Sequence, residues 1–185
     1  MTNDSSLLSQ FSKGINGLND FIGRLVSWLA LGMVLVGAWN TVARFLDREI
    51  GTELSSNTWL ETGWYMFAAL FLFGAAWTLR KNAHVRVDIF YSRLTERGKT
   101  WTDLLGSLLL LIPFCLFMIW AVWPSVVDSW EIKEMSPDPG GLPRWPIRMA
   151  VLLAFVLLLL QGIATMLKGI SLLSHNGRVV EEKVG

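Results

Sequence analysis

Residues 147–167 have the sequence IRMAVLLAFVLLLLQGIATML, in which Arg148 is the only charged side chain. About 20 mostly apolar residues in a helix cross the hydrocarbon core of a bilayer, and this stretch has that length. Three further runs share the property, at residues 25–46, 59–79 and 104–123. They are continuous runs rather than ten-residue alternations, which disfavours a membrane β-barrel. The sequence therefore predicts an all-α membrane protein with four transmembrane helices.

The composition of the whole chain agrees with a bilayer environment. Of 185 residues, 52% are apolar and only 17% are charged, whereas soluble domains carry about 25% charged residues. The net charge of +1 gives no electrostatic support for binding nucleic acid. Cys115 is the only cysteine, which excludes an intrachain disulfide framework and a thiolate metal cluster. We expect residues 1–185 to form a single membrane domain.

Lys and Arg are distributed unevenly among the segments outside the four runs. Most lie before the first run, between the second and third, and after the fourth. Because positive side chains favour the cytoplasmic side, this bias predicts that both termini are cytoplasmic. The first run is longer than the apolar part of a signal peptide, and no Ala-x-Ala-like site follows it. We therefore expect it to be retained as a helix.

Residues 5–22, ahead of the first span, have an amphipathic pattern. The apolar side chains recur at helical spacing, at Leu7, Leu8, Phe11, Ile15, Leu18 and Ile22. This spacing predicts an N-terminal amphipathic helix that lies on the cytoplasmic surface of the membrane. The alternative is a frayed terminus with chance spacing.

A few polar side chains lie within the predicted spans, where they are energetically expensive. Arg44 ends the first span and Glu61 begins the second, and a short loop joins these two ends. We therefore predict an ion pair between Arg44 and Glu61. The alternative is that Glu61 is a proton or cation site, although its position near the interface favours the structural role. Asn40 and Gln161 are expected to form interhelical hydrogen bonds, and Trp64 to pack between helices.

Pro113 lies in the middle of the third span. Proline lacks a backbone donor and clashes with the preceding helical turn, so the sequence predicts a kink there. Such a kink more often fixes a static shape than serves gating.

The predicted cytoplasmic loop, residues 80–91, alternates polar with apolar side chains. His84, Arg86 and Asp88 are separated by Val85 and Val87. A period of two indicates a short extended segment, and Asp88 is well placed to cap a helix that follows it. The alternative is a basic loop that only sets the topology.

The predicted outer loop, residues 131–146, is rich in proline, glycine and acidic residues. This composition is typical of an irregular connection with limited freedom. The loop either docks an external partner or is simply solvated, and composition alone favours solvation.

Several kinds of catalytic or cofactor site are missing from the sequence. The two histidines, His84 and His175, lie outside the predicted spans, which argues against a bis-histidine haem. One cysteine cannot make a membrane thiol oxidoreductase. The chain has no Walker A, HExxH or Asp-rich metal motif. We therefore expect no catalytic residue, no metal, no cofactor and no enzymatic activity.

Three stretches resemble one transporter family. The first runs from Glu61-Thr62-Gly63-Trp64-Tyr65 to Ala83-His84-Val85-Arg86-Val87-Asp88, and the second is Glu134-x-Ser136 followed by Gly141-x-Pro143-x-Trp145. The third is the Leu-rich run that ends in Gln161. Together they resemble the small membrane subunit, of the DctQ type, of tripartite ATP-independent periplasmic (TRAP) transporters. The resemblance covers nearly the whole chain.

The resemblance implies a place in the bacterial inner membrane as a multi-pass subunit of an ion-coupled symport system for organic acids. A periplasmic solute-binding receptor captures the substrate, and a large permease subunit carries it across. The small subunit braces the large one within the lipid bilayer and helps to dock the receptor. The interface residues this implies form three groups: Arg44, Glu61, Trp64 and Gln161 for helix packing; His84, Arg86 and Asp88 on the cytoplasmic face; and Glu131, Glu134, Ser136, Pro143 and Arg144 for receptor docking.

Two other functions are weighed against this one. The chain could be a self-contained small transporter that acts as a homodimer, with Glu61 as its coupling carboxylate. It could also be a membrane lipid or quinone enzyme, against which the missing metal, haem and thiol ligands count. The substrate and the coupling ion are not encoded in any motif of this chain.

Overall fold

The fold is given by a computed structural model, which describes residues 2–51, 53–83, 91 and 93–184. Helices make up most of these residues, and the described part contains no named strand. Four helical segments are long and apolar enough to cross a membrane, namely Ser12–Ile50, Asn57–Arg80, Arg97–Glu131 and Trp145–Ser171. The predicted all-α membrane fold with four transmembrane helices is thereby confirmed.

Helix α1 (Thr2–Ile50) is one continuous helix of 49 residues. The sequence predicts a surface helix over residues 5–22 and a separate span over residues 25–46, but the structure has no break between them. Nothing in the residues between them stops a helix, because they include no proline and Gly23 alone costs only about 1 kcal/mol in a helix. The amphipathic segment is therefore helical as expected and continues directly into the first span.

Helix α2 (Asn57–Arg80) matches the predicted second span closely. The Ser56 side chain caps its N-terminus by accepting a hydrogen bond of 3.1 Å from the Thr58 backbone N–H. At its other end Asn82 takes a positive φ of 53°, which asparagine tolerates better than most residues. Both ends of α2 are thus set by local side-chain chemistry.

The third span is longer than predicted and contains one irregular turn. It is built from α4 (Glu96–Gly106), the π-helical turn η1 (Ser107–Leu111) and α5 (Ile112–Glu131), which follow one another without a gap. Pro113 has no N–H to give to the preceding turn and its ring crowds that turn. The wider π turn lies directly before it, so the predicted irregularity is present one turn upstream of the proline.

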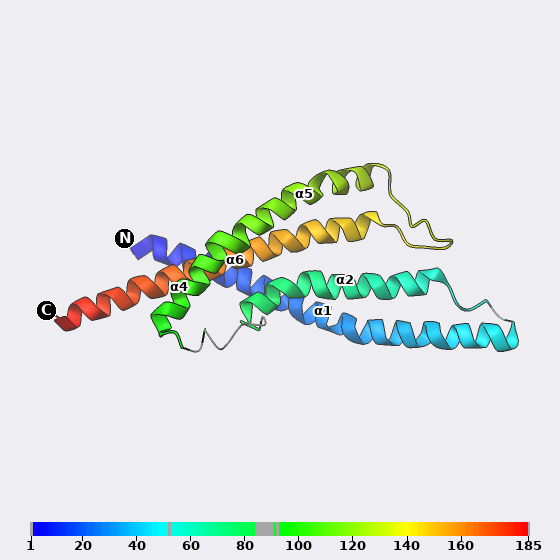
Figure 1. Cartoon of the computed structure of the whole chain (residues 1–185), viewed down its shortest axis with the longest axis horizontal. Coiled ribbons are helices and arrows are strands. Elements are labelled where there is room, and N and C mark those ends of the chain that lie inside the picture. Colours follow the sequence, from blue (N-terminus) through cyan, green and yellow to red (C-terminus); the bar gives the residue numbers. More distant parts are fainter. Residues whose placement is uncertain (1, 52, 84–90, 92, 185) are drawn as a thin grey trace.

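Helix α6 (Trp145–Val184) is the element that holds the bundle together. It packs against α1, α2, α4 and α5, whereas α1 and α2 pack mainly on each other. Figure 1 shows α1 with α2 and α5 with α6 as two hairpins, and places both chain termini at the same end. We call this the terminal end, and we call the opposite end, which carries residues 53–56 and 132–144, the connector end.

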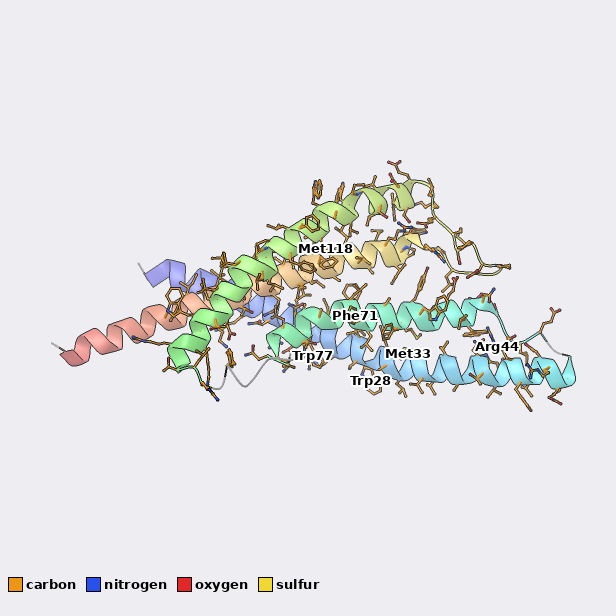
Figure 2. All side chains as sticks on the ribbon, in the orientation of Figure 1. Trp28, Met33, Arg44, Phe71, Trp77 and Met118 are labelled. Atoms are coloured by element: carbon orange, nitrogen blue, oxygen red, sulfur yellow. The ribbon has the colours of Figure 1, made fainter. Side chains whose placement is uncertain are left out.

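Many large apolar side chains are exposed on the outside of the bundle. Figure 2 shows side chains projecting outward along all the helices, and Trp28, which is 71% exposed, is one of them. Polar side chains show the opposite preference, since Asn19, Asn40, Glu61 and Gln161 are all buried. A membrane protein is expected to turn its polar groups inward in this way, because lipid offers them no hydrogen bonds.

Candidate functional site

The buried carboxylate of Glu61 is the centre of a polar site at the connector end. Glu61 lies about one turn into α2 and is only 3% exposed. One of its oxygens, Oε1, accepts a short hydrogen bond from the Ser136 hydroxyl. The other, Oε2, accepts a bond of 2.5 Å from the Leu142 backbone N–H. We call this arrangement of Glu61, Ser136 and Leu142 the connector-end clasp.

The predicted ion pair between Arg44 and Glu61 is wrong. Both oxygens of Glu61 bond to the 132–144 loop, and the described residues contain no contact of Glu61 with Arg44. Arg44, labelled in Figure 2, instead lines an open cavity of about 330 Å³ together with Ser55, Asn57 and Pro139. Sequence proximity favours the neighbouring helix end as the partner, whereas in the structure a loop from far along the chain folds back and bonds to the carboxylate.

The loop over residues 132–144 is an irregular connection, as predicted, and its backbone forms hydrogen bonds with itself. Ser136 N–H donates to Leu142 O at 3.1 Å and Arg144 N–H donates to Glu134 O at 2.8 Å. An isolated antiparallel bridge joins Met135 to Pro143 between these bonds. The loop thus pairs with itself before it contacts α2.

Further hydrogen bonds fasten this loop to the first turns of α2. The Thr58 hydroxyl donates to Gly140 O, and Asn57 Nδ2 donates to Pro139 O at 3.0 Å. Two turns deeper, the Tyr65 hydroxyl donates to Pro143 O at 2.9 Å. Each bond joins α2 to residues some 80 positions later in the chain, so the clasp ties the two hairpins together.

Gly141 shows how closely the loop approaches α2. A Cβ added there would lie 2.4 Å from the Cβ of Ser136 and 2.9 Å from Oε1 of Glu61. No side chain fits in that space, because atoms in a packed interior keep van der Waals distance. A glycine at this position is therefore a requirement of the connector-end clasp.

A second contact braces the 132–144 loop against α6 beside the clasp. The Arg148 guanidinium makes a bidentate pair with Glu134, at 2.7 Å from Nε to Oε2 and 2.8 Å from Nη2 to Oε1. The Ser129 hydroxyl and this guanidinium hold the pKa of Glu134 below its ordinary value. Lys133 Nζ lies 3.3 Å from the ring centroid of Trp130, a cation–π arrangement that adds to the same junction.

The remaining residues predicted for this end are scattered around the clasp. Arg144 and Trp64 line a cavity of about 280 Å³ between α2 and α6. Trp64 is 56% exposed, so it lies at the bundle surface rather than between packed helices. Glu131 is exposed at the last residue of α5.

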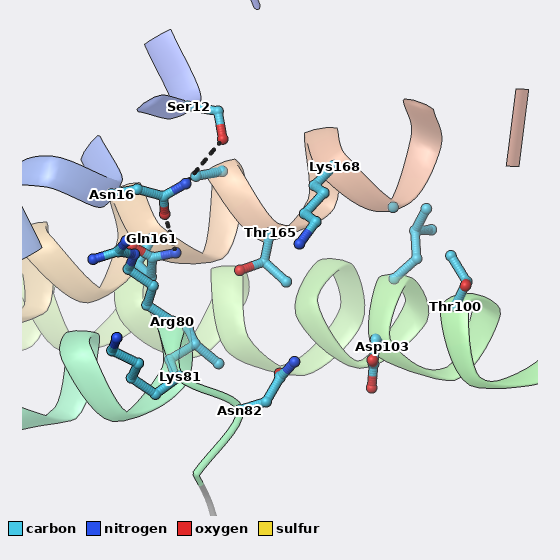
Figure 3. Close-up of a pocket in the computed structure, with 14 residues that line it drawn as sticks. Ser12, Asn16, Arg80, Lys81, Asn82, Thr100, Asp103, Gln161, Thr165 and Lys168 are labelled. Atoms are coloured by element: carbon cyan, nitrogen blue, oxygen red, sulfur yellow. Dashed lines mark hydrogen bonds between the residues drawn. The ribbon is translucent and has the colours of Figure 1, made fainter. Parts of the chain in front are cut away.

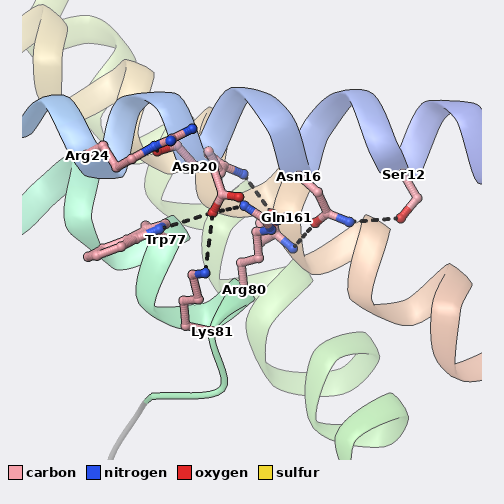
Figure 4. Close-up of polar contacts among 9 residues, drawn as sticks. Ser12, Asn16, Asp20, Arg24, Trp77, Arg80, Lys81 and Gln161 are labelled. Carbon is pink, nitrogen blue, oxygen red and sulfur yellow. Dashed lines mark hydrogen bonds and ion pairs between the residues drawn. The ribbon is translucent and has the colours of Figure 1, made fainter.

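The terminal end has its own polar cluster, centred on Asp20 of α1. Figure 4 shows the Trp77, Arg80 and Lys81 side chains of α2 gathered around this carboxylate. Trp77 Nε1 donates to Asp20 Oδ1 at 3.2 Å, Arg80 forms an ion pair with the same oxygen, and Lys81 Nζ lies 3.9 Å from it. We call Asp20, Trp77 and Arg80 the terminal-end lock. The Trp77 ring also rests on the backbone at Gly23, where an added Cβ would come within 2.2 Å of the ring.

Gln161 links α6 to α1 next to this lock. Asn19 Nδ2 donates to Gln161 Oε1 at 2.7 Å, and Gln161 Nε2 donates to Asn16 Oδ1 at 3.2 Å. Asn19 and Gln161 are both buried, so these bonds satisfy groups that lipid could not. The polar face of the N-terminal amphipathic segment therefore faces the bundle, while Leu18 and Phe21 are exposed.

A polar cavity of about 480 Å³ opens beside the lock, between α2, α4 and α6. Figure 3 shows Arg80 and Lys81 on one side of it and Thr165 and Lys168 on the other. Its cations lie at the end of the bundle where the sequence places the cytoplasm. A hydrated, basic membrane interface accounts for such a lining.

The sequence found only part of these two sites. It singled out Glu61, Ser136 and Gln161, and it included Gly141 only as part of a loop motif, but it missed Asp20 and the role of Trp77. Asp20 lies on the polar face of the N-terminal amphipathic segment, which was expected to face water. Arg80 was counted only among the positive charges that predict the cytoplasmic side. His84, Arg86 and Asp88 lie outside the described residues, so their prediction is not addressed by the structure. Among the described residues, no cluster of His, Cys, Asp and Glu is arranged to hold a metal ion.

Comparison with known families decides the class of protein. The model of the family described as "Tripartite ATP-independent periplasmic transporters, DctQ component" matches residues 33–172, which include parts of all four spans. The chain belongs to the DctQ family. It is thus a TRAP transporter component and a multi-pass protein of the inner membrane, in a family of transporter components rather than enzymes. No curated protein and no solved structure gave a match.

Proposed function

We propose that this DctQ component is the small permease subunit of a TRAP uptake system for organic acids. In this proposal it scaffolds the large permease subunit and helps to dock the periplasmic receptor. The observation that carries the proposal is the connector-end clasp, in which each oxygen of the Glu61 carboxylate accepts a hydrogen bond from a loop. A transported ion would have to compete with the loop for these oxygens, which favours a structural role for Glu61.

The bracing role is supported by where the polar groups of the spans lie. Asn19 and Gln161 bond to each other, and Glu61 bonds to the loop. A carrier of organic anions needs cationic groups or broken helices near the middle of the membrane. The polar groups of this chain instead tie its own helices together, which suits a rigid support for a larger membrane partner.

Receptor docking is supported by the fixed shape of the 132–144 loop. It is bonded to itself and to α2, so little conformational entropy is lost when another protein binds to it. Asp138 and Glu131 remain exposed on this end and give it acidic character. Exposed charges of this kind steer a partner into register and speed its association.

The alternative, a homodimeric transporter with Glu61 as coupling carboxylate, makes a different prediction for uptake. We expect proteoliposomes with this chain alone to take up no organic acid, and proteoliposomes with this chain, the large permease and the receptor to do so. Glu61→Gln in the complete system should leave the ion dependence of uptake unchanged. Uptake by the chain alone, or loss of ion coupling in Glu61→Gln, would overturn the scaffold proposal.

The docking role has its own test. Asp138→Lys reverses an exposed charge on the loop, and we expect it to slow receptor association with the assembled permease several-fold at low salt, with a smaller effect at high salt. Lys13→Glu, an exposed change at the terminal end, is the matched control and should have no effect. Equal receptor kinetics for wild type and Asp138→Lys would remove the acidic loop from the docking surface.

A further inference from the structure

A groove between α1 and α2 has no occupant among the described residues. Its volume is about 350 Å³, and its lining includes Gly37, Asn40, Trp59, Gly63, Trp64 and Phe67. Met33, labelled in Figure 2, lies at the same groove, where α1 and α2 run side by side. The groove is open to the outside of the bundle and lies within the membrane-spanning part of both helices.

Asn40 gives this otherwise apolar groove an unsatisfied polar group. Its side chain is only 7% exposed, and its Oδ1 has no hydrogen-bond partner within the described part of the chain. The other buried amides of the spans, Asn19 and Gln161, are both bonded. A buried amide without a partner costs free energy, so it calls for a group supplied from outside the chain.

Two glycines make the groove accessible to another helix. A Cβ added at Gly37 or at Gly63 would meet no atom within 4 Å. Small residues on a transmembrane surface allow a neighbouring backbone to come close, which is the usual basis of helix association in lipid. Trp64 and Phe67 are exposed near Gly63 and form one wall of the groove.

The choice of occupant follows from what Asn40 requires. A lipid acyl chain would fill the groove but has no hydrogen-bonding group. A second copy of this chain related by two-fold symmetry would place groove against groove, which leaves a void instead of filling one. A helix with a hydroxyl or amide side chain would both fill the space and donate a hydrogen bond to Oδ1 of Asn40.

We propose that this groove seats one transmembrane helix of the large permease subunit, which presents a hydroxyl or amide side chain to Asn40. The inference rests on the proposed scaffold function and adds the face through which the scaffold acts. Gly37 and Gly63 set how close that helix comes, and Asn40 sets its register along α1.

Filling the groove tests the proposal without disturbing the fold. In the complete transporter, Gly37→Leu or Gly63→Leu should lower the affinity between this chain and the large permease about tenfold, equivalent to about 1.4 kcal/mol. Gly106→Leu on α4 is the matched control, because a Cβ there also meets no atom within 4 Å and α4 does not line the groove. All three variants should keep the wild-type melting temperature as isolated chains. Equal affinity for wild type and both groove variants would overturn the proposal.

Asn40→Leu separates a docking role from a structural one. Removing an unpaired buried amide should leave the melting temperature of the isolated chain unchanged or raise it. The same change should weaken the complex, because the partner's polar side chain then loses its own bond. A fall in the isolated chain's melting temperature with no change in affinity would mean that Asn40 serves the chain's own fold.

Photo-crosslinking identifies what occupies the groove. A photoreactive residue in place of Phe67, which is 56% exposed, should give an adduct with the large permease, and one in place of Phe117, 59% exposed on α5, should not. An adduct of twice the chain mass at position 67, or no protein adduct there in an intact complex, would overturn the proposal. If the wild-type chain forms no complex at all, the scaffold function itself fails. If the complex forms but its affinity is unchanged in the groove variants, the scaffold function stands and only the proposed docking face is refuted.

Discussion

At the scale of single residues, Gly23 lacks a side chain where the ring of Trp77 packs against its backbone. The Trp77 side chain lies where the Cβ of any other residue would be. We predict that Gly23→Ala lowers the free energy of unfolding in detergent by about 1–3 kcal/mol, the usual cost of overpacking. Gly17→Ala on the same helix meets no atom within 4 Å, and it should be neutral or slightly stabilising. Similar stability for the two variants would contradict the packing seen between α1 and α2.

Glu134 carries a prediction about pH, because its pKa is lowered in the folded chain by Ser129 and Arg148. A carboxyl whose pKa is lower in the folded than in the unfolded chain stabilises the fold. This stabilisation is complete when the pH is above the unfolded-state pKa, and it is lost as the pH falls through the folded-state pKa. The reference value for the carboxyl is 4.5. We therefore expect wild type to exceed Glu134→Gln in melting temperature above that pH, and the difference to shrink below it. A difference that grows on acidification would show that the Glu134–Arg148 pair does not stabilise the loop.

At the scale of elements, the contact between α1 and α6 depends on a pair of buried amides. Gln161→Leu leaves Asn19 buried and unpaired, and we expect a loss of about 1 kcal/mol in unfolding free energy. Asn19→Leu should cost a similar amount, and the double variant should cost less than the sum of the two. The four proteins form a double-mutant cycle, measured by thermal unfolding in detergent. Strict additivity would show that the 2.7 Å bond between these side chains contributes nothing.

The helices themselves follow from short-range properties of the sequence. The length of each apolar run predicted the span, and Pro113 predicted an irregular turn, whereas the Ser56 cap at the start of α2 was seen only in the structure. The predictions were less accurate at the ends, where α1, α5 and α6 all continue past the apolar runs. A helix ends where its backbone is capped or broken, and this does not coincide with where its side chains stop being apolar.

At the scale of the whole molecule, the termini, the last residue of α2 and the first residue of α4 lie toward one end of the bundle (Figure 1). The distribution of Lys and Arg predicts that this end faces the cytoplasm. In a Cys115→Ala background, we expect Asp138→Cys to react with a membrane-impermeant thiol reagent in intact spheroplasts. Lys13→Cys, exposed near the opposite end, should react only after permeabilisation. The reverse labelling pattern would show that the topology is opposite to the predicted one. The 132–144 loop would then face the cytoplasm, and the receptor-docking proposal would be wrong.

From the sequence alone it could be predicted that the protein lies in a lipid bilayer, that it has four spans and which family it belongs to. These depend on the length of apolar runs and on local motifs, which are properties of neighbouring residues. The tertiary structure decided which polar groups meet. Ser136 lies 75 positions from Glu61, and Gln161 lies 142 positions from Asn19. A buried polar group takes whichever partner the folded chain brings nearest, because being left unpaired in lipid costs more than any local preference. For that reason Glu61 bonds to the far loop instead of Arg44.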